Sequence, residues 1–173
     1  DTVIWKDRNG TFVFFACERE KGRIGVNLIS ELFVNLFQIN GSITRLWKIY
    51  DFADDGLTSV GFIKDSRKVI DIDNDGTNET IFMYAICSDG LEPIKIKLML
   101  HNHYQKYAIR GEIPKDENYL DTYRKNIDPN FYKCDKRILS FALEYWNKHI
   151  RLCAKDFLSD TLIDSMLNLI AVL

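Results

Sequence analysis

An Asn-Gly dipeptide between two long apolar segments is the feature of this sequence that most restricts its fold. Residues 32–39 and 42–52 flank Asn40-Gly41, and a turn of this composition is the strongest short signal for two antiparallel strands. In the second segment, Trp47 and Ile49 alternate with more polar positions, which predicts one buried and one solvated face. The sequence therefore predicts an antiparallel β-sheet.

Similar apolar runs separated by turn residues extend over about two thirds of the chain. From Asp135 onward, in contrast, apolar residues recur at helical spacing, and Asp135 is a suitable N-cap for a helix ending near Cys153. A second helix is expected from residue 159 or 160 to 169. The fold class is therefore predicted to be α+β, with one antiparallel, meander-like β-sheet of about seven to nine strands followed by two C-terminal α-helices packed on it. The expected strands cover residues 11–17, 32–39, 42–52, 61–63, 68–72, 80–86, 94–100 and 104–110, with a mobile loop at 18–27 and the last strand ending near Ile113-Pro114.

Length and charge limit the class of protein. The 173 residues suit a single domain over 1–173, with a β-rich part at 1–114 and a helical end at 130–173 packed on it. A net charge of −2 argues against a nucleic-acid partner. Because no apolar run reaches 18 residues, no transmembrane segment is expected. The chain begins with Asp1, which leaves either a removed export signal or a shortened chain.

The segment DIDNDGTNE at residues 71–79 predicts a calcium site. Calcium takes six to eight oxygen ligands at about 2.3–2.6 Å, and alternating acids on a tightly wound loop direct their oxygens to one centre. Gly76 allows the sharp turn. An EF-hand is excluded because its twelfth position, normally Glu, is Phe82, and because strand-like segments flank the loop. The expected ligands are the side chains of Asp71, Asp73, Asp75 and Glu79 and the backbone carbonyl of Thr77. The alternative is a solvated acidic turn, although four carboxylates without a cation would repel one another.

Other candidate residues have simpler structural interpretations. His101 and His103 are expected to be solvated at a hairpin tip rather than to bind a metal, and Asp54-Asp55 to form a turn. The tryptophans Trp5, Trp47 and Trp146 are expected in the core, with sugar stacking as the alternative.

The four cysteines, Cys17, Cys87, Cys134 and Cys153, do not have the spacing of a zinc site. Buried thiols are favoured over disulfides, but the bonding state of the cysteines stays open. Cys134 and Cys153, at the ends of one helix roughly 28 Å long, are too far apart to pair.

Several motifs within residues 40–112 together resemble a known family. They are Leu46-Trp47-Lys48-Ile49 with Asp51-Phe52, the acidic loop followed by Ile81-Phe82-Met83-Tyr84, Cys87 with Asp89-Gly90 and Pro93, and residues 106–111. In this order they are similar to small bacterial envelope proteins known as surface polysaccharide biosynthesis proteins, and the loop itself resembles the D-x-D-x-D-G calcium loops of integrin-type FG-GAP blades. The resemblance implies export to the periplasm or cell envelope, with a cytoplasmic location as the alternative. It supplies no catalytic residue.

Three functions remain open at this point. The first is a non-enzymatic calcium-binding envelope protein associated with surface polysaccharide, whose partner is a glycan. The second is an immunity-type inhibitor protein that binds and neutralises a secreted bacterial toxin. The third is a hydrolase whose catalytic acids the sequence does not identify. Because no His, Cys or Ser adjoins the acidic loop, a structural calcium ion is favoured over a catalytic one.

Overall fold

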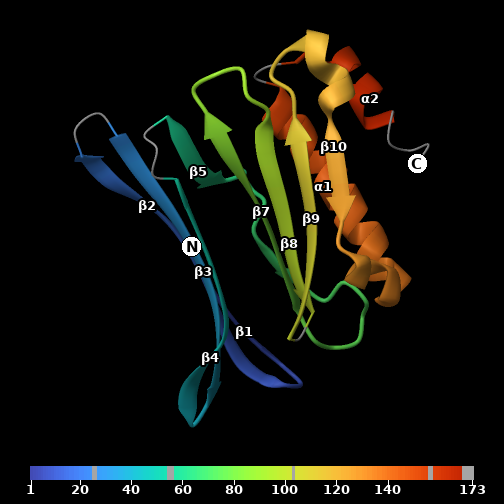
Figure 1. Cartoon of the computed structure of the whole chain (residues 1–173). Coiled ribbons are helices and arrows are strands. Elements are labelled where there is room, and N and C mark those ends of the chain that lie inside the picture. Colours follow the sequence, from blue (N-terminus) through green and yellow to red (C-terminus); the bar gives the residue numbers. More distant parts are fainter. Residues whose placement is uncertain (25–26, 54–56, 103, 156–157, 169–173) are drawn as a thin grey trace.

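A computed structural model describes residues 1–24, 27–53, 57–102, 104–155 and 158–168. It contains two antiparallel sheets followed by two α-helices, which confirms the predicted α+β class (Figure 1). The first sheet, called here the N-terminal sheet, has the order β1-β2-β3-β4, and the second, the central sheet, has the order β10-β9-β8-β7-β5 with β6 also paired to β7. The strands are β1 (Thr2–Asp7), β2 (Gly10–Ile24), β3 (Asn27–Asn40), β4 (Ser42–Ala53), β5 (Thr58–Phe62), β6 (Lys68–Ile70), β7 (Glu79–Ser88), β8 (Ile94–Asn102), β9 (Gln105–Ile113) and β10 (Arg124–Ile127).

The N-terminal sheet follows the alternation of its sequence. The predicted hairpin is confirmed, because Asn40 pairs with Ser42 across Gly41, which has a φ of 70°. The expected loop at 18–27 is wrong for residues 18–24 and 27, since β2 continues to Ile24 and β3 begins at Asn27, and residues 25–26 lie outside the described residues. Two charged side chains at the start of this segment have partners that a strand allows. Arg19 pairs with Glu31 opposite it on β3, and Glu18 accepts a hydrogen bond from the N–H of Phe62 on β5.

The central sheet is buried on both faces, so β7 has a continuous apolar sequence rather than an alternating one. One face contributes Phe82, Tyr84 and Met99 to a core shared with the N-terminal sheet. The opposite face contributes Ile81, Met83 and other apolar side chains to a core shared with the helices. Figure 1 shows the resulting three layers, with the N-terminal sheet on one side of the central sheet and α1 on the other. The expected single sheet is therefore two packed sheets.

The helices α1 (Lys136–Ala154) and α2 (Asp160–Asn168) confirm the predicted helical end. Asp135 caps α1 as expected, because its side chain accepts a hydrogen bond from the backbone N–H of Arg137. Trp146 of α1 is fully buried against Gly111 of β9. A Cβ at Gly111 would lie 2.7 Å from the Trp146 ring, so the glycine permits this close packing.

The region between Ile113 and α1 contains structure that the sequence did not predict. Strand β10 pairs with β9 and becomes an edge of the central sheet, and two short 3₁₀ segments cover Glu117–Thr122 and Pro129–Lys133.

No disulfide joins the four cysteines, which are all half-buried. Among the described residues, no helix has the length and apolarity needed to cross a membrane.

Candidate metal centre

The acidic loop connects β6 to β7 and is tightly wound. Asn74 and Gly76 have φ values of 54° and 83°, both in the left-handed region. A Cβ at Gly76 would meet nothing closer than 3.9 Å, so the backbone conformation rather than lack of space favours glycine there. Asp71 stabilises this winding, because its two carboxylate oxygens accept hydrogen bonds from the N–H groups of Asp75 and Gly76.

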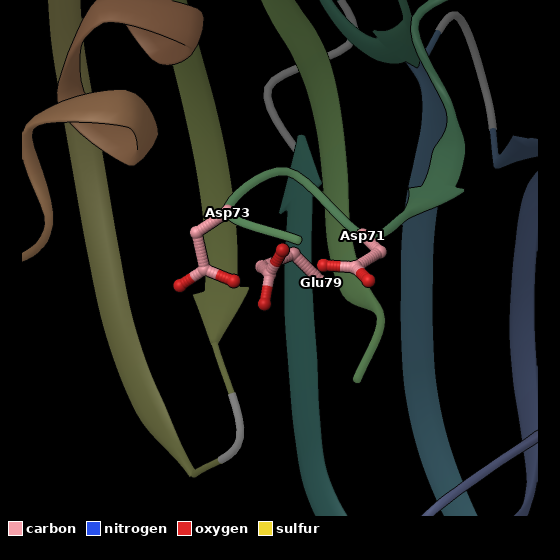
Figure 2. Close-up of side chains that lie close together, drawn as sticks. All are labelled: Asp71, Asp73 and Glu79. Atoms are coloured by element: carbon pink, nitrogen blue, oxygen red, sulfur yellow. The ribbon is translucent and has the colours of Figure 1, made fainter. Parts of the chain in front are cut away.

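Three of the predicted ligand side chains come together. Figure 2 shows the carboxyl groups of Asp71 and Asp73 on either side of Glu79. One oxygen from each of the three residues lies within 4.8 Å of the others. Two ligands on opposite sides of a calcium ion are separated by about 4.6–5.2 Å, twice the usual Ca–O distance of ~2.3–2.6 Å. The three oxygens are therefore close enough to share one such cation.

Burial makes this arrangement of carboxylates unfavourable on its own. Glu79 is fully buried and Asp73 is 8% exposed. Glu79 Oε2 accepts a hydrogen bond from the N–H of Ile72, but Glu79 Oε1 and Asp73 Oδ1 are buried with no hydrogen-bond partner in the structure. Burial, with the negative charges of Asp73, Asp75 and Asp71, raises the pKa of Glu79 to about 7. A cation would satisfy both oxygens and offset the repulsion.

The other two predicted ligands have different surroundings. Asp75 Oδ1 accepts hydrogen bonds from the backbone N–H and the hydroxyl of Thr77, and Asp75 Oδ2 accepts one from Arg8. The Asp75 carboxylate is therefore not part of the three-residue cluster. Thr77 is buried, and the role predicted for its carbonyl oxygen stays a prediction.

The turn between β1 and β2 contacts the acidic loop, which sequence patterns did not indicate. Arg8 forms a salt bridge of 3.1 Å with Asp75, and Asp7 Oδ2 accepts a hydrogen bond of 3.3 Å from the N–H of Asn78. These partners are about 70 residues apart in the chain, so only the packing of the two sheets brings them together. A cation in the loop would therefore also affect the position of the β1–β2 turn.

His101 differs most from expectation. The sequence predicted a solvated residue at a hairpin tip, but β8 extends to Asn102 and His101 faces the N-terminal sheet, where it is 4% exposed. Its ring stacks on Trp47 with 3.9 Å between the ring centres. Burial, aided by the positive charge of Lys106, lowers the pKa of His101 to about 3, so its ring is neutral.

The remaining sequence candidates divide between the core and the undescribed segments. Trp146 is fully buried in the core, as predicted, and Trp5 and Trp47 are half-buried and pack against the core between the two sheets. His103 and Asp54-Asp55 lie outside the described residues.

No protein-family model, curated protein or solved structure matches this chain. The resemblance over residues 40–112 therefore stays a prediction.

Proposed function

We propose that this chain is a non-enzymatic, calcium-binding protein of the bacterial envelope. The observation that carries the proposal is the cluster of Asp71, Asp73 and Glu79, in which two buried carboxylate oxygens have no hydrogen-bond partner. Hard oxygen donors of this kind suit calcium, whose flexible coordination tolerates a partly protein and partly water shell. The envelope location and the association with surface polysaccharide rest on the sequence resemblance alone.

The proposed ion has a structural role. It would hold β6 and β7 together at the loop and, through Asp75 and Arg8, position the turn between β1 and β2. An ion that binds only the folded chain stabilises it by linkage, by about 2.7 kcal/mol at 100 times the dissociation constant. A calcium ion whose charge is balanced by several carboxylates is also a weak electrophile, which favours a structural role over a catalytic one.

The test is thermal unfolding in calcium and in chelator. Wild-type protein is expected to have a higher Tm in calcium, and Asp73→Ala is expected to abolish that rise because it removes one of the clustered carboxylates. Asp89→Ala is the matched control, since Asp89 is exposed and belongs to the β7–β8 turn. A rise of the same size in Asp73→Ala would contradict the proposed site.

A second candidate function, the toxin inhibitor, is favoured by the outer face of the N-terminal sheet. Apolar side chains remain exposed there, with Phe15 at 38%, Tyr50 at 44% and Phe52 at 49%. Lys48 lies 5.2 Å from the centre of the Tyr50 ring. Exposed aromatic residues next to a cation are frequent anchors of protein interfaces. Nanomolar binding to one toxin, lost in Phe52→Asp, would support this function over the first.

A further inference from the structure

A cavity next to the acidic loop is used by neither proposed function. It has a volume of about 270 Å³ and lies between the two sheets, where strands β1 to β4 of one sheet face β7 and β8 of the other. The acidic loop contributes Thr77 and Asn78 to its wall. The same loop therefore forms the candidate cation site and one side of the cavity.

Aromatic and aliphatic side chains form much of the cavity wall. Trp5 and Phe12, both at the wall, stack on each other with 5.3 Å between ring centres. His101, also at the wall, is held by its stacking on Trp47. Leu36 and Leu46 add aliphatic surface. Fixed aromatic rings of this kind favour a ligand with an apolar ring face.

Two buried polar side chains also contribute to the cavity wall. Thr80 and His101 line the cavity and are directly opposite each other on β7 and β8. Thr80 is 1% exposed and His101 is 4% exposed, and neither Thr80 Oγ1 nor His101 Nδ1 has a hydrogen-bond partner in the structure. Buried polar atoms without partners are unfavourable. A ligand hydroxyl that reaches them after a small shift of the wall side chains would therefore be stabilised.

The charges at the wall argue against an anionic ligand. Asp7 is the acidic residue of the lining, which includes no Lys or Arg among the described residues. The carboxylate of Asp7 already accepts hydrogen bonds from Trp5 Nε1 and from the N–H groups of Asn9 and Asn78. His101 is neutral because its pKa is lowered. A phosphate or carboxylate would therefore meet a negative charge and find no compensating cation.

We propose that this cavity binds one neutral, hydroxyl-rich ring, which is the chemistry of an uncharged sugar residue. The volume is slightly below the ~300–1,000 Å³ typical of pockets for drug-sized ligands, so a single ring is the expected size. This proposal deepens the proposed function. It rests on that function in one respect: the binding of the ligand is expected to be coupled to the binding of calcium, because the loop that would hold the ion forms part of the cavity wall. Calcium is expected to tighten ligand binding because it would fix the loop that carries Thr77 and Asn78. By linkage, the ligand then tightens calcium binding by the same factor.

The test is an NMR titration of the full ¹⁵N-labelled chain with uncharged methyl glycosides of glucose, galactose, mannose and N-acetylglucosamine. At least one is expected to shift the Trp5 indole and Asn78 amide signals saturably, more tightly in calcium than in chelator. Glucuronate is expected to bind at least tenfold more weakly. Leu46→Phe, which adds volume at the wall, is expected to weaken binding at least tenfold, whereas Ile43→Phe, at a position 72% exposed, leaves it unchanged. If Leu46→Phe does not fold, Gln38→Phe at the half-buried cavity wall replaces it.

Two results would overturn the inference. One is the absence of saturable shifts at Trp5 and Asn78 with all four glycosides, and the other is equal binding to wild type and the cavity variant. Calcium is titrated in the same samples and read at the amides of residues 71–79, so the two proposals fail separately. Calcium binding without glycoside binding refutes the cavity assignment alone. Glycoside binding that is equal in calcium and chelator refutes the coupling.

Discussion

Replacing Glu79 by Gln changes the charge of the candidate metal centre with little change in shape. Glu79 is fully buried among three acidic residues, and its pKa is raised from 4.5 to about 7. At about 1.4 kcal/mol for each pH unit, this difference corresponds to roughly 3 kcal/mol between the folded and unfolded states. The amide of Gln retains an oxygen that can accept the hydrogen bond from Ile72 and carries no charge at any pH.

The effect of this substitution depends on pH in a defined direction. Below pH 4.5, Glu79 is protonated in both the folded and the unfolded wild-type chain, so burial of its charge does not lower the free energy of unfolding. As the pH rises from 4.5 to about 7, the unfolded chain loses this proton and the folded chain retains it, so the metal-free wild type loses stability. At pH 8, metal-free Glu79→Gln is therefore expected to be more stable than wild type by about 3 kcal/mol.

Calcium is expected to reverse this order. At about 1,000 times its dissociation constant, it would add about 4 kcal/mol to the wild type, whereas Glu79→Gln lacks one charged ligand. The measurement is urea unfolding followed by circular dichroism at pH 4.5, 6 and 8, in calcium-free buffer and in calcium. Glu92→Gln, at an exposed position, is the control. A metal-free variant less stable than wild type at pH 8, or a stability difference that does not vary with pH, would contradict the raised pKa of Glu79.

Three further predictions concern the same structure. Asp75→Ala is expected to retain a calcium-dependent rise in Tm that Asp73→Ala loses, because the Asp75 carboxylate is directed to Arg8 and Thr77; equal loss in both variants would place Asp75 among the ligands. Gly111→Ala is expected to destabilise the fold by about 1–3 kcal/mol in urea unfolding, because its Cβ would lie 2.6 Å from the carbonyl oxygen of Arg124; an unchanged midpoint would show that β9 and β10 can separate without cost. Thr80→Val is expected to raise the free energy of unfolding of the ligand-free protein by about 1 kcal/mol, since it removes a buried hydroxyl without a hydrogen-bond partner. A lower Tm for the variant in differential scanning calorimetry would show that this hydroxyl makes a stabilising hydrogen bond.

Local sequence signals predicted most secondary structure because they act over short distances. The hairpin at Asn40-Gly41 and the helix capped by Asp135 depend on neighbouring residues, and both are confirmed. Strand β10 was missed because it covers only Arg124–Ile127 and gains its stability by pairing with β9. The division into two sheets was also missed. It depends on which faces pack together, and a period-two pattern identifies a buried face without identifying its partner.

The site was predictable to the extent that it is local. The spacing of acids at residues 71–79 predicted that carboxylates would converge, and those of Asp71, Asp73 and Glu79 do. The pattern did not show that Asp75 would instead contact Arg8, because that partner comes from the β1–β2 turn. Nor did it show that His101 would be buried against Trp47, since the packing of the two sheets determines that contact.

Isothermal titration of the metal-free protein with calcium at pH 8 is the direct test of the proposed metal centre. One ion is expected to bind per chain, and binding is expected to be lost in Asp73→Ala, because the cluster of Asp71, Asp73 and Glu79 is the proposed site. Absence of calcium binding to the folded wild type, or the same binding in Asp73→Ala, would contradict it.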